Sequence, residues 1–464
     1  MRKLLTAQTS IAPLVVFRAL FGFIMAVSVL RFALNGWIYE LYVRPTYFFT
    51  YYGFDWVVPP GELGLYVLFG LMGLAALGIM LGWHYRIASV LFFLTFTYVE
   101  LIDKTNYLNH YYFVSIISFL LIWVPAHRSF SLDVRRNPGL RVDTVPAWTV
   151  NIFKFQLGLV YVFAGLAKLN PDWLLDAMPL RLWLPAHAHL PLVGGLLAEP
   201  LTAYLFSWAG AVYDLTIVFF LLWRRTRLPA YLAVLAFHLT TALLFQIGMF
   251  PYIMILSTLI FFPASFHEAL LDRLRALWSR IARRPVAVPR AAVAALPVPL
   301  RYSRRASAAL AVLLTLHVVV QVLVPLRSVL YPGHLFWTEE GYRFSWRVML
   351  MEKAGYATFR VRDPDTGRQW EVANWEYLTP NQEKMMATQP DMILQFAHFL
   401  EDTYRQQGLE DVEITVEAYV TLNGRRSRLM IDPSVDLTAV ERGLRHKTWV
   451  LPFAEEQDRW ISRR

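Results

Sequence analysis

The sequence contains no cysteine, and charged residues make up only 17% of its 464 positions, against about 25% in a typical soluble domain. The absence of cysteine excludes disulfide bonds, thiolate nucleophiles, iron–sulfur clusters and cysteine-ligated zinc. The sequence also lacks a Walker motif, a dinucleotide-binding glycine fingerprint, a Gly-x-Ser-x-Gly turn and a His-Glu-x-x-His pair. The enzyme classes that depend on those features are therefore excluded.

Apolar residues dominate the composition instead. Hydrophobic residues account for 56% and aromatic residues for 15% of the chain, and the mean hydropathy is +0.40. This composition predicts a polytopic membrane protein with a smaller soluble part. The formal net charge is +10, but the basic residues cluster in short loops between apolar runs, so we expect no nucleic-acid partner. No cleavable signal peptide is predicted, because the apolar run from Ile11 continues to Leu34 without a small-residue cleavage site.

The apolar runs predict a polytopic α-helical membrane domain of about nine spans over residues 1–330. Two of the runs, 111–125 and 250–263, are short for a span and are expected to tilt or to use flanking residues. The nine runs are residues 12–34, 63–82, 87–102, 111–125, 150–168, 203–223, 229–246, 250–263 and 308–326.

Lysine and arginine residues are distributed unequally between alternate loops. With a cytoplasmic N-terminus, 19 of them fall in cytoplasmic segments and 3 in outer loops. The positive-inside rule therefore predicts an integral protein of the inner (cytoplasmic) membrane with an extracytoplasmic C-terminal domain. The basic stretch 264–307 is predicted to be a cytoplasmic linker, helical over 266–281, that meets anionic membrane lipid.

From about Leu335 charged residues become frequent and apolar residues begin to alternate. This change predicts a small extracytoplasmic α+β domain over residues 335–464. Asn423-Gly424 favours a type I′ turn and marks the clearest hairpin. The predicted elements are a strand at 343–351, a hairpin of 356–362 with 368–373, an amphipathic helix at 380–407 and a hairpin of 412–422 with 425–431.

Lys168 ends the apolar run that includes Ile152, at the predicted outer face of the membrane. An ammonium group there loses hydration, which favours the neutral amine, and such a lysine can act as a base near neutral pH. A lysine near a helix end more often extends its charged group to the membrane surface. The residues alone leave both roles open.

Other polar residues are predicted near the same face. Asn109 and His110 open a span, where they could stabilise an oxyanion or simply form a polar helix start. His238 and Gln246 lie along the approach to this face, and a buried histidine that satisfies a neighbouring span is the commoner case. Asp214 lies within a span and could pair with a Lys, His or Tyr group of another span.

No metal site is predicted from the sequence. His187 and His189 are two residues apart in an outer loop and flank prolines, but no pair of carboxylates lies nearby. Two histidines in this arrangement give only a weak metal signal.

The run from Tyr161 to Trp173, Tyr-Val-Phe-Ala-Gly-Leu-Ala-Lys-Leu-Asn-Pro-Asp-Trp, resembles the catalytic-lysine segment of the vitamin K-dependent gamma-carboxylases. Further similar stretches occur in the order that the family shows, and together they span most of residues 10–453. The chain is thus identified as similar to bacterial members of this family, of the type with a horizontally transferred transmembrane domain. The further stretches are Asn109-His110, 245–252, 341–346, 431–436 and 448–452.

The resemblance implies a carbon–carbon lyase with coupled epoxidase activity. In that family, reduced vitamin K is oxygenated by O2 to its epoxide, and this drives removal of a γ-proton from a protein glutamate and addition of CO2. The implied cofactor is a quinol, either vitamin K hydroquinone or menaquinol. The implied partner is a glutamate-containing protein or peptide, while the oligomeric state stays open.

The resemblance also implies roles for individual residues. Lys168 would be the base that starts the cycle, and His110 with Asn109 would orient or stabilise the oxygenated intermediate. The chain departs from the vertebrate enzymes at Ala167, where they have a second lysine, and it ends soon after Pro452, without most of the region that docks a substrate propeptide. The implied substrate-binding residues are Tyr342, Arg343, Ser345, Trp346 and Gln246.

Two alternative functions stay open. The chain could be a quinol epoxidase or oxidoreductase that does not carboxylate glutamate, since the propeptide-docking region is missing. It could also be a non-catalytic membrane protein on the same fold, in which case Lys168 would matter for stability alone.

Overall fold

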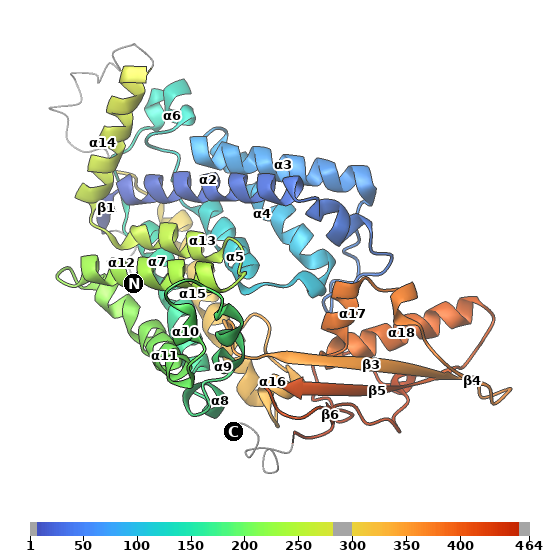
Figure 1. Cartoon of the computed structure of the whole chain (residues 1–464). Coiled ribbons are helices and arrows are strands. Elements are labelled where there is room, and N and C mark those ends of the chain that lie inside the picture. The colour runs from blue at the N-terminus through green and yellow to red at the C-terminus, as the bar shows by residue number, and fades with distance from the viewer. Residues whose placement is uncertain (1–6, 282–298, 454–464) are drawn as a thin grey trace.

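The computed structural model describes residues 7–281 and 299–453, which form a helical bundle followed by an α+β domain at one end of it (Figure 1). The bundle helices consist of nearly uninterrupted apolar residues, as the hydropathy pattern predicts. They are α2 (Ala12–Leu34), α3 (Gly61–Leu81), α4 (Tyr85–Ile102), α5 (Asn109–Trp123), α7 (Trp148–Ala167), α11 (Pro200–Leu222), α12 (Arg227–Leu244), α13 (Phe250–Thr258) and α15 (Arg304–Leu326).

Seven helices in the described ranges are long and apolar enough to cross a membrane, and there are eight if a bent pair counts as one span. The seven helices, the bent pair and the shorter apolar helix α5 together account for the predicted number of about nine. The two short predicted runs are the elements that are short or bent. α5 has 15 residues, and α13 with the turn after it is bent by 114° against α14 (Ala264–Ile281).

Alternate ends of the bundle helices meet the α+β domain, and we call this end of the bundle the domain face. Three polar contacts define it. Lys104, after α4, pairs with Asp391. Asp172, after α7, pairs with Arg425. Arg327, after α15, donates a hydrogen bond to the hydroxyl of Ser345.

The opposite end of the bundle, the far face, carries short elements and the amphipathic helix α14. β1 (Gln8–Ser10) pairs antiparallel with β2 (Thr144–Pro146) there, and the Ser10 hydroxyl donates to Glu268 of α14. The predicted helix at 266–281 is confirmed by α14, whereas residues 282–298 of the predicted linker lie outside the described ranges. The other short helices are α6 (Leu132–Arg136) at the far face, α8 (Pro171–Leu174), α9 (Leu180–Trp183) and α10 (Gly194–Leu197) between α7 and α11, and α16 (Leu335–Thr338).

The α+β domain is a four-stranded antiparallel sheet covered on one face by two helices (Figure 1). Along β5 buried residues alternate with partly exposed ones, which is the pattern of a sheet with one face in a core. The helices are α17 (Pro380–Met386) and α18 (Pro390–Gln406). The strand order is β4 (Gln369–Glu371), β3 (Lys353–Arg362), β5 (Glu413–Leu422) and β6 (Arg428–Leu429).

Both predicted hairpins of this domain are confirmed, as β3–β4 and β5–β6. Asn423 and Gly424 have φ angles of 50° and 72°, and a type I′ turn requires a positive φ at both of its central positions. The predicted single helix at 380–407 is instead two helices. Pro390 causes the break, because it lacks a backbone N–H and disfavours helix at the preceding residue.

The predicted strand at 343–351 is wrong, because this segment is a series of turns. Phe344, Trp346 and Met349 have φ angles of 61°, 57° and 54°, in the left-handed region that no strand uses. The Phe344 N–H donates to the hydroxyl of Tyr107 at 2.7 Å, and the Trp346 ring stacks on Tyr112. The apolar residues alternate here because the segment is held between bundle and domain.

Candidate functional site

Lys168 directly follows α7, and its side chain is buried. Its Nζ donates a hydrogen bond to Oδ2 of Asp214 in α11 at 2.7 Å, and each side chain is only 7% exposed. The Nζ also lies 5.2 Å from the ring centroid of Trp173, within the range of a cation–π contact. The predicted pairing of Asp214 with a polar group of another span is therefore confirmed.

Gly165 allows α7 and α11 to approach closely enough for this ion pair. A Cβ atom at position 165 would lie 2.8 Å from the backbone nitrogen of Leu215, which immediately follows Asp214. Any larger residue at this position would therefore push the two backbones apart. Because Gly165 is one turn before Lys168, it sets the separation of the helices that carry the amine and the carboxylate.

The Lys168–Asp214 pair borders a cavity of about 90 Å³ whose lining is largely apolar. The Tyr161 hydroxyl and the His238 Nε2 lie 3.0 Å apart in the same lining. The buried Nδ1 of His238 has no hydrogen-bond partner in the described part of the chain. Besides Tyr161, the Trp and Phe residues of the lining are Trp173, Trp183, Phe206, Phe237, Phe245 and Phe250.

Asn109 and His110 lie in the first turn of α5, at the domain face but outside this cavity. The described residues that line the cavity include neither of them. The buried His110 ring is 5.9 Å from the ring of Phe250, which does line it. The Asn109 side chain donates to the backbone oxygen of Arg347 at 3.0 Å. One residue, Phe250, therefore separates His110 from the Lys168 cavity. Asn109 holds the turns formed by residues 341–349, which are called the 341–349 turns here.

The predicted substrate-binding residues divide into three groups. Tyr342 and Arg343 line a second cavity, described below. Ser345 and Trp346 are 3% and 1% exposed and hold the turns in place: the serine hydroxyl donates to a backbone carbonyl, and the indole packs on the bundle. Gln246 is exposed and is not among the residues that line either cavity.

Val348 and Met349, at the other end of the 341–349 turns, line the Lys168 cavity. Neither residue was predicted to form part of the site. The turns thus join both cavities, because Tyr342 and Arg343 line the second one.

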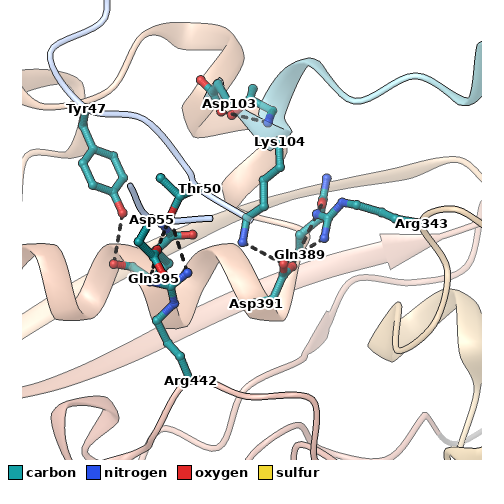
Figure 2. Close-up of polar contacts among 11 residues, drawn as sticks. Tyr47, Thr50, Asp55, Asp103, Lys104, Arg343, Gln389, Asp391, Gln395 and Arg442 are labelled. Atoms are coloured by element: carbon teal, nitrogen blue, oxygen red, sulfur yellow. Dashed lines mark hydrogen bonds and ion pairs between the residues drawn. The ribbon is translucent and has the colours of Figure 1, made fainter. Parts of the chain in front are cut away.

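The second cavity lies between the bundle and the α+β domain, has a volume of about 360 Å³, and is called the junction cavity here. Lys104 from the bundle and Arg343 from the turns converge on Asp391 of α18, as Figure 2 shows. Lys104 Nζ and Arg343 Nη1 each lie 2.8 Å from Oδ2 of this carboxylate. Arg343 also donates to the side-chain oxygen of Gln389. One carboxylate therefore serves two buried cations.

This crowding shifts the acidity of the groups at the junction cavity. Burial lowers the pKa of Lys104 to about 8, although the nearby Asp391 carboxylate acts in the opposite direction. Burial alone would raise the pKa of Asp391, but the charges and hydrogen bonds of Arg343 and Lys104 outweigh it and hold this pKa well below its usual range. Asp391 also lies in the first turn of α18, where the helix dipole favours a negative charge.

Asp172 ties the loop that follows Lys168 to the hairpin turn of the domain. Its Oδ2 accepts hydrogen bonds from Asn423 at 2.5 Å and from Arg425 at 2.8 Å, and its Oδ1 accepts a second one from Arg425 at 2.5 Å. Burial would raise the pKa of Asp172, but these partners lower it below its ordinary value. Because Trp173 is the next residue, the domain fixes the aromatic ring beside the Lys168 ammonium.

Two family models match the chain. The model of the HTTM domain matches residues 7–266, and the model of the vitamin K-dependent gamma-carboxylase, lumenal domain, matches residues 306–456. The chain belongs to the vitamin K-dependent gamma-carboxylase family. This gamma-carboxylase family member is thus an integral membrane protein with a C-terminal lumenal-type domain. No solved structure matches the chain, and the bacterial source that the sequence resemblance implies stays a prediction.

In this gamma-carboxylase family member, no group of three or more His, Asp or Glu side chains could hold a metal ion within residues 7–281 and 299–453. The rings of His187 and His189 lie 6.2 Å apart, and each ring contacts a nearby backbone carbonyl. The two histidines therefore act as local loop contacts.

Replacement of Arg425 is expected to loosen the loop after Lys168 in this family member. Arg425→Gln leaves the buried Asp172 carboxylate with fewer donors, which costs about 1–3 kcal/mol in a buried site. We expect faster hydrogen–deuterium exchange of residues 168–176 and a lower unfolding temperature of the purified protein. Arg426→Gln, at an exposed position of the same hairpin, is the control and should change neither. Unchanged exchange in Arg425→Gln would contradict this role.

Proposed function

We propose that this family member is a vitamin K-dependent γ-glutamyl carboxylase with coupled quinol epoxidation, in which Lys168 is the base. The observation that carries the proposal is the buried pair of Lys168 and Asp214, 2.7 Å apart at the edge of an apolar cavity. A base in such a site is shielded from water, which would otherwise quench it. Family membership supports the same activity.

Asp214 provides a destination for the proton of Lys168. Both ions of a buried pair have lost their hydration. The free-energy difference between the ion pair and the neutral pair of amine and carboxylic acid is therefore smaller than it is in water. When the proton passes from Nζ to Oδ2, Lys168 becomes a free amine that can accept a proton from an acidic hydroxyl group in the cavity. Asp214 is therefore proposed as the positioning residue that controls the charge of Lys168.

The lining of the Lys168 cavity fits a lipophilic quinol. Its aromatic side chains suit a flat ring, and the unpartnered Nδ1 of His238 can bond to a ring oxygen. When bound, reduced vitamin K or menaquinol supplies, together with O2, the strong base that removes the glutamate γ-proton. The chain's own residues hold the ring, keep water out and move the first proton at Nζ.

For Asn109 and His110 the geometry supports positioning roles. Asn109 holds the turns that carry Val348 and Met349 into the cavity, through its bond to Arg347. His110 packs against Phe250, which also contacts His238 with ring centroids 5.8 Å apart. We therefore expect His110 to act on the cavity through the Phe250 ring.

The 341–349 turns are the proposed route of the glutamate substrate. Val348 and Met349 border the Lys168 cavity on the domain side, so a side chain that enters between bundle and domain passes them. CO2 would follow the same route and add to the glutamate carbanion. Tyr342 and Arg343 line the junction cavity and are not part of this route.

The test of the carboxylase is incorporation of labelled CO2 into a glutamate-containing peptide. Purified protein in detergent is given reduced vitamin K, O2 and the peptide, and epoxide is measured in the same samples. Label in the peptide together with epoxide is the expected result. Samples without quinol are the control and should yield neither product. A folded protein that yields neither product with all substrates present would overturn the proposal.

One observation favours the second candidate, a quinol epoxidase without carboxylation. Among the described residues that line the cavity, Lys168 is the one lysine or arginine, and it already pairs with Asp214. A glutamate carboxylate would thus find no unpaired ammonium or guanidinium group there. Epoxide formation without labelled peptide would select this candidate.

We also propose that the far face is cytoplasmic and that the protein lies in the inner membrane. The 19-to-3 distribution of lysine and arginine supports this orientation. The chain has no cysteine, so single-cysteine variants have no background. With Leu444→Cys in the domain and Leu277→Cys in α14, which are 70% and 53% exposed, we expect a membrane-impermeant maleimide to label intact cells only at position 444. Labelling only at position 277 would reverse the orientation.

A further inference from the structure

The junction cavity contains more positive than negative charge. Lys104 and Arg343 share the single carboxylate of Asp391. Arg327, in the same lining, donates to two backbone carbonyls and one serine hydroxyl, and within the described residues it forms no ion pair with a carboxylate. Two cations of the lining are therefore not neutralised by the protein.

The remaining charged residues of the lining are balanced. Arg442 pairs with Asp55 at 2.9 Å, and Glu339 pairs with Lys353 at 2.8 Å. Glu340 accepts from His446 at 2.8 Å and lies 3.6 Å from Lys447 Nζ. The positive excess thus belongs to the group of Lys104, Arg327 and Arg343, which we call the cationic cluster.

The cavity lies at the level where the membrane helices end. Leu101 in the last turn of α4 and Val324 in the last turn of α15 form part of its lining. Next to these positions lies the polar network around Lys104, Arg343 and Asp391 that Figure 2 shows. This level corresponds to the headgroup region of a bilayer, where phosphates are found.

Exposed apolar side chains flank the cavity. Tyr52, Phe54 and Leu444 belong to its lining and are 56%, 40% and 70% exposed. Val329 and Leu330, which follow Arg327 closely in the chain, are 80% and 82% exposed. A cationic cavity beside large exposed apolar residues favours a ligand that has both an anionic group and apolar chains over a ligand that is polar throughout.

We propose that the junction cavity binds an anionic phospholipid, with the phosphate on the cationic cluster and the acyl chains along the apolar side chains around Val329 and Leu330. The phosphate supplies the negative charge that the cluster lacks, and arginine is well suited to hold it. A soluble acidic peptide would supply the charge but leave Val329 and Leu330 in water. The inference is independent of the carboxylase activity, because binding is measured without turnover.

The test uses the full chain with a single cysteine, Leu444→Cys, that carries a fluorophore. The protein is placed in phosphatidylcholine discs that contain a small fraction of nitroxide-labelled lipid, either phosphatidylglycerol or phosphatidylcholine with identical chains. We expect phosphatidylglycerol to quench more, with a local preference of roughly fivefold for each unneutralised cation. Leu63→Cys, 78% exposed at the start of α3 on the same membrane face, is the control and should be quenched equally by both lipids.

Arg327→Gln in the Leu444→Cys background should lower the preference roughly fivefold, because it removes one of the two unneutralised charges. Equal quenching by the two lipids at position 444 of the otherwise unaltered chain would overturn the proposal, whether or not Arg327→Gln folds. Displacement of the labelled phosphatidylglycerol by inorganic phosphate would show a site for free phosphate. Displacement by a polyglutamate peptide but not by unlabelled phosphatidylglycerol would show a peptide site. Either displacement also overturns the proposal.

Discussion

Lys168→Ala is expected to lower both CO2 incorporation and epoxide formation by roughly 10²–10⁴-fold, the usual contribution of a general base. The two products should fall together, because the proposed proton transfer to Nζ precedes both. The measurement is labelled peptide and epoxide per mole of protein at saturating quinol and peptide. Lys154→Ala, which changes another lysine of α7, is the matched control and should retain activity. Loss of labelled peptide with unchanged epoxide formation in Lys168→Ala would contradict the assignment.

Asp214→Asn separates a positioning role from a purely structural one. Without the carboxylate, the ammonium of Lys168 must lose its proton to solvent, so the remaining activity should rise with pH more steeply than that of the wild-type protein. A merely destabilised protein would lose activity equally at every pH. The pH profile of epoxide formation, measured at constant protein stability, distinguishes the two.

Asp391→Asn is expected to lower the free energy of unfolding by roughly 3 kcal/mol, because removal of one partner of a buried ion pair leaves uncompensated charge. Here two cations, Lys104 and Arg343, would lose their shared carboxylate. Unfolding by heat and denaturant in a fixed detergent measures the loss. Asp402→Asn, 65% exposed in the same helix, removes only a surface ion pair and should cost less than about 1 kcal/mol. Equal losses of unfolding free energy in the two variants would contradict the importance of the ion pairs that Asp391 forms with Lys104 and Arg343.

The stability that Asp391 contributes should depend on pH in a known direction. Its pKa is lowered in the folded protein, so its contribution is present above the unfolded value of about 3.9 and is lost as the pH falls below it. The difference between the wild-type protein and Asp391→Asn should therefore shrink in acid. Lys104 acts at the other end of the range. Because its folded pKa of about 8 lies below the unfolded value of about 10.4, the cost of its burial should diminish as the pH rises between them.

Features with a local signal could be predicted from the sequence. The apolar runs predicted the helices, and Asn423-Gly424 predicted the hairpin that holds Asp172. Lys168 and Asp214 were both selected because charged residues in apolar runs are costly and need partners. The sequence leaves Lys, His or Tyr open as the partner of Asp214, and the structure shows that the partner is Lys168, at 2.7 Å.

Features that depend on distant parts of the chain could not be predicted. Lys104 and Asp391 are 287 positions apart, and neither lies in a motif with a known chemical role. The 341–349 turns alternate polar and apolar residues as a strand does, and only packing between bundle and domain explains their positive φ angles. Apolar composition alone also does not report the short length of α5 or the bend after α13.

The short helix α5 has a consequence for where the water–lipid boundary lies. Its 15 residues extend about 22 Å, whereas the hydrocarbon core of a bilayer is about 30 Å thick. The first residue of α5, Asn109, is bonded to the backbone of Arg347, so the 341–349 turns cover this end of the helix. Where the helix is too short to reach the surface of a bilayer, the 341–349 turns supply the remaining thickness.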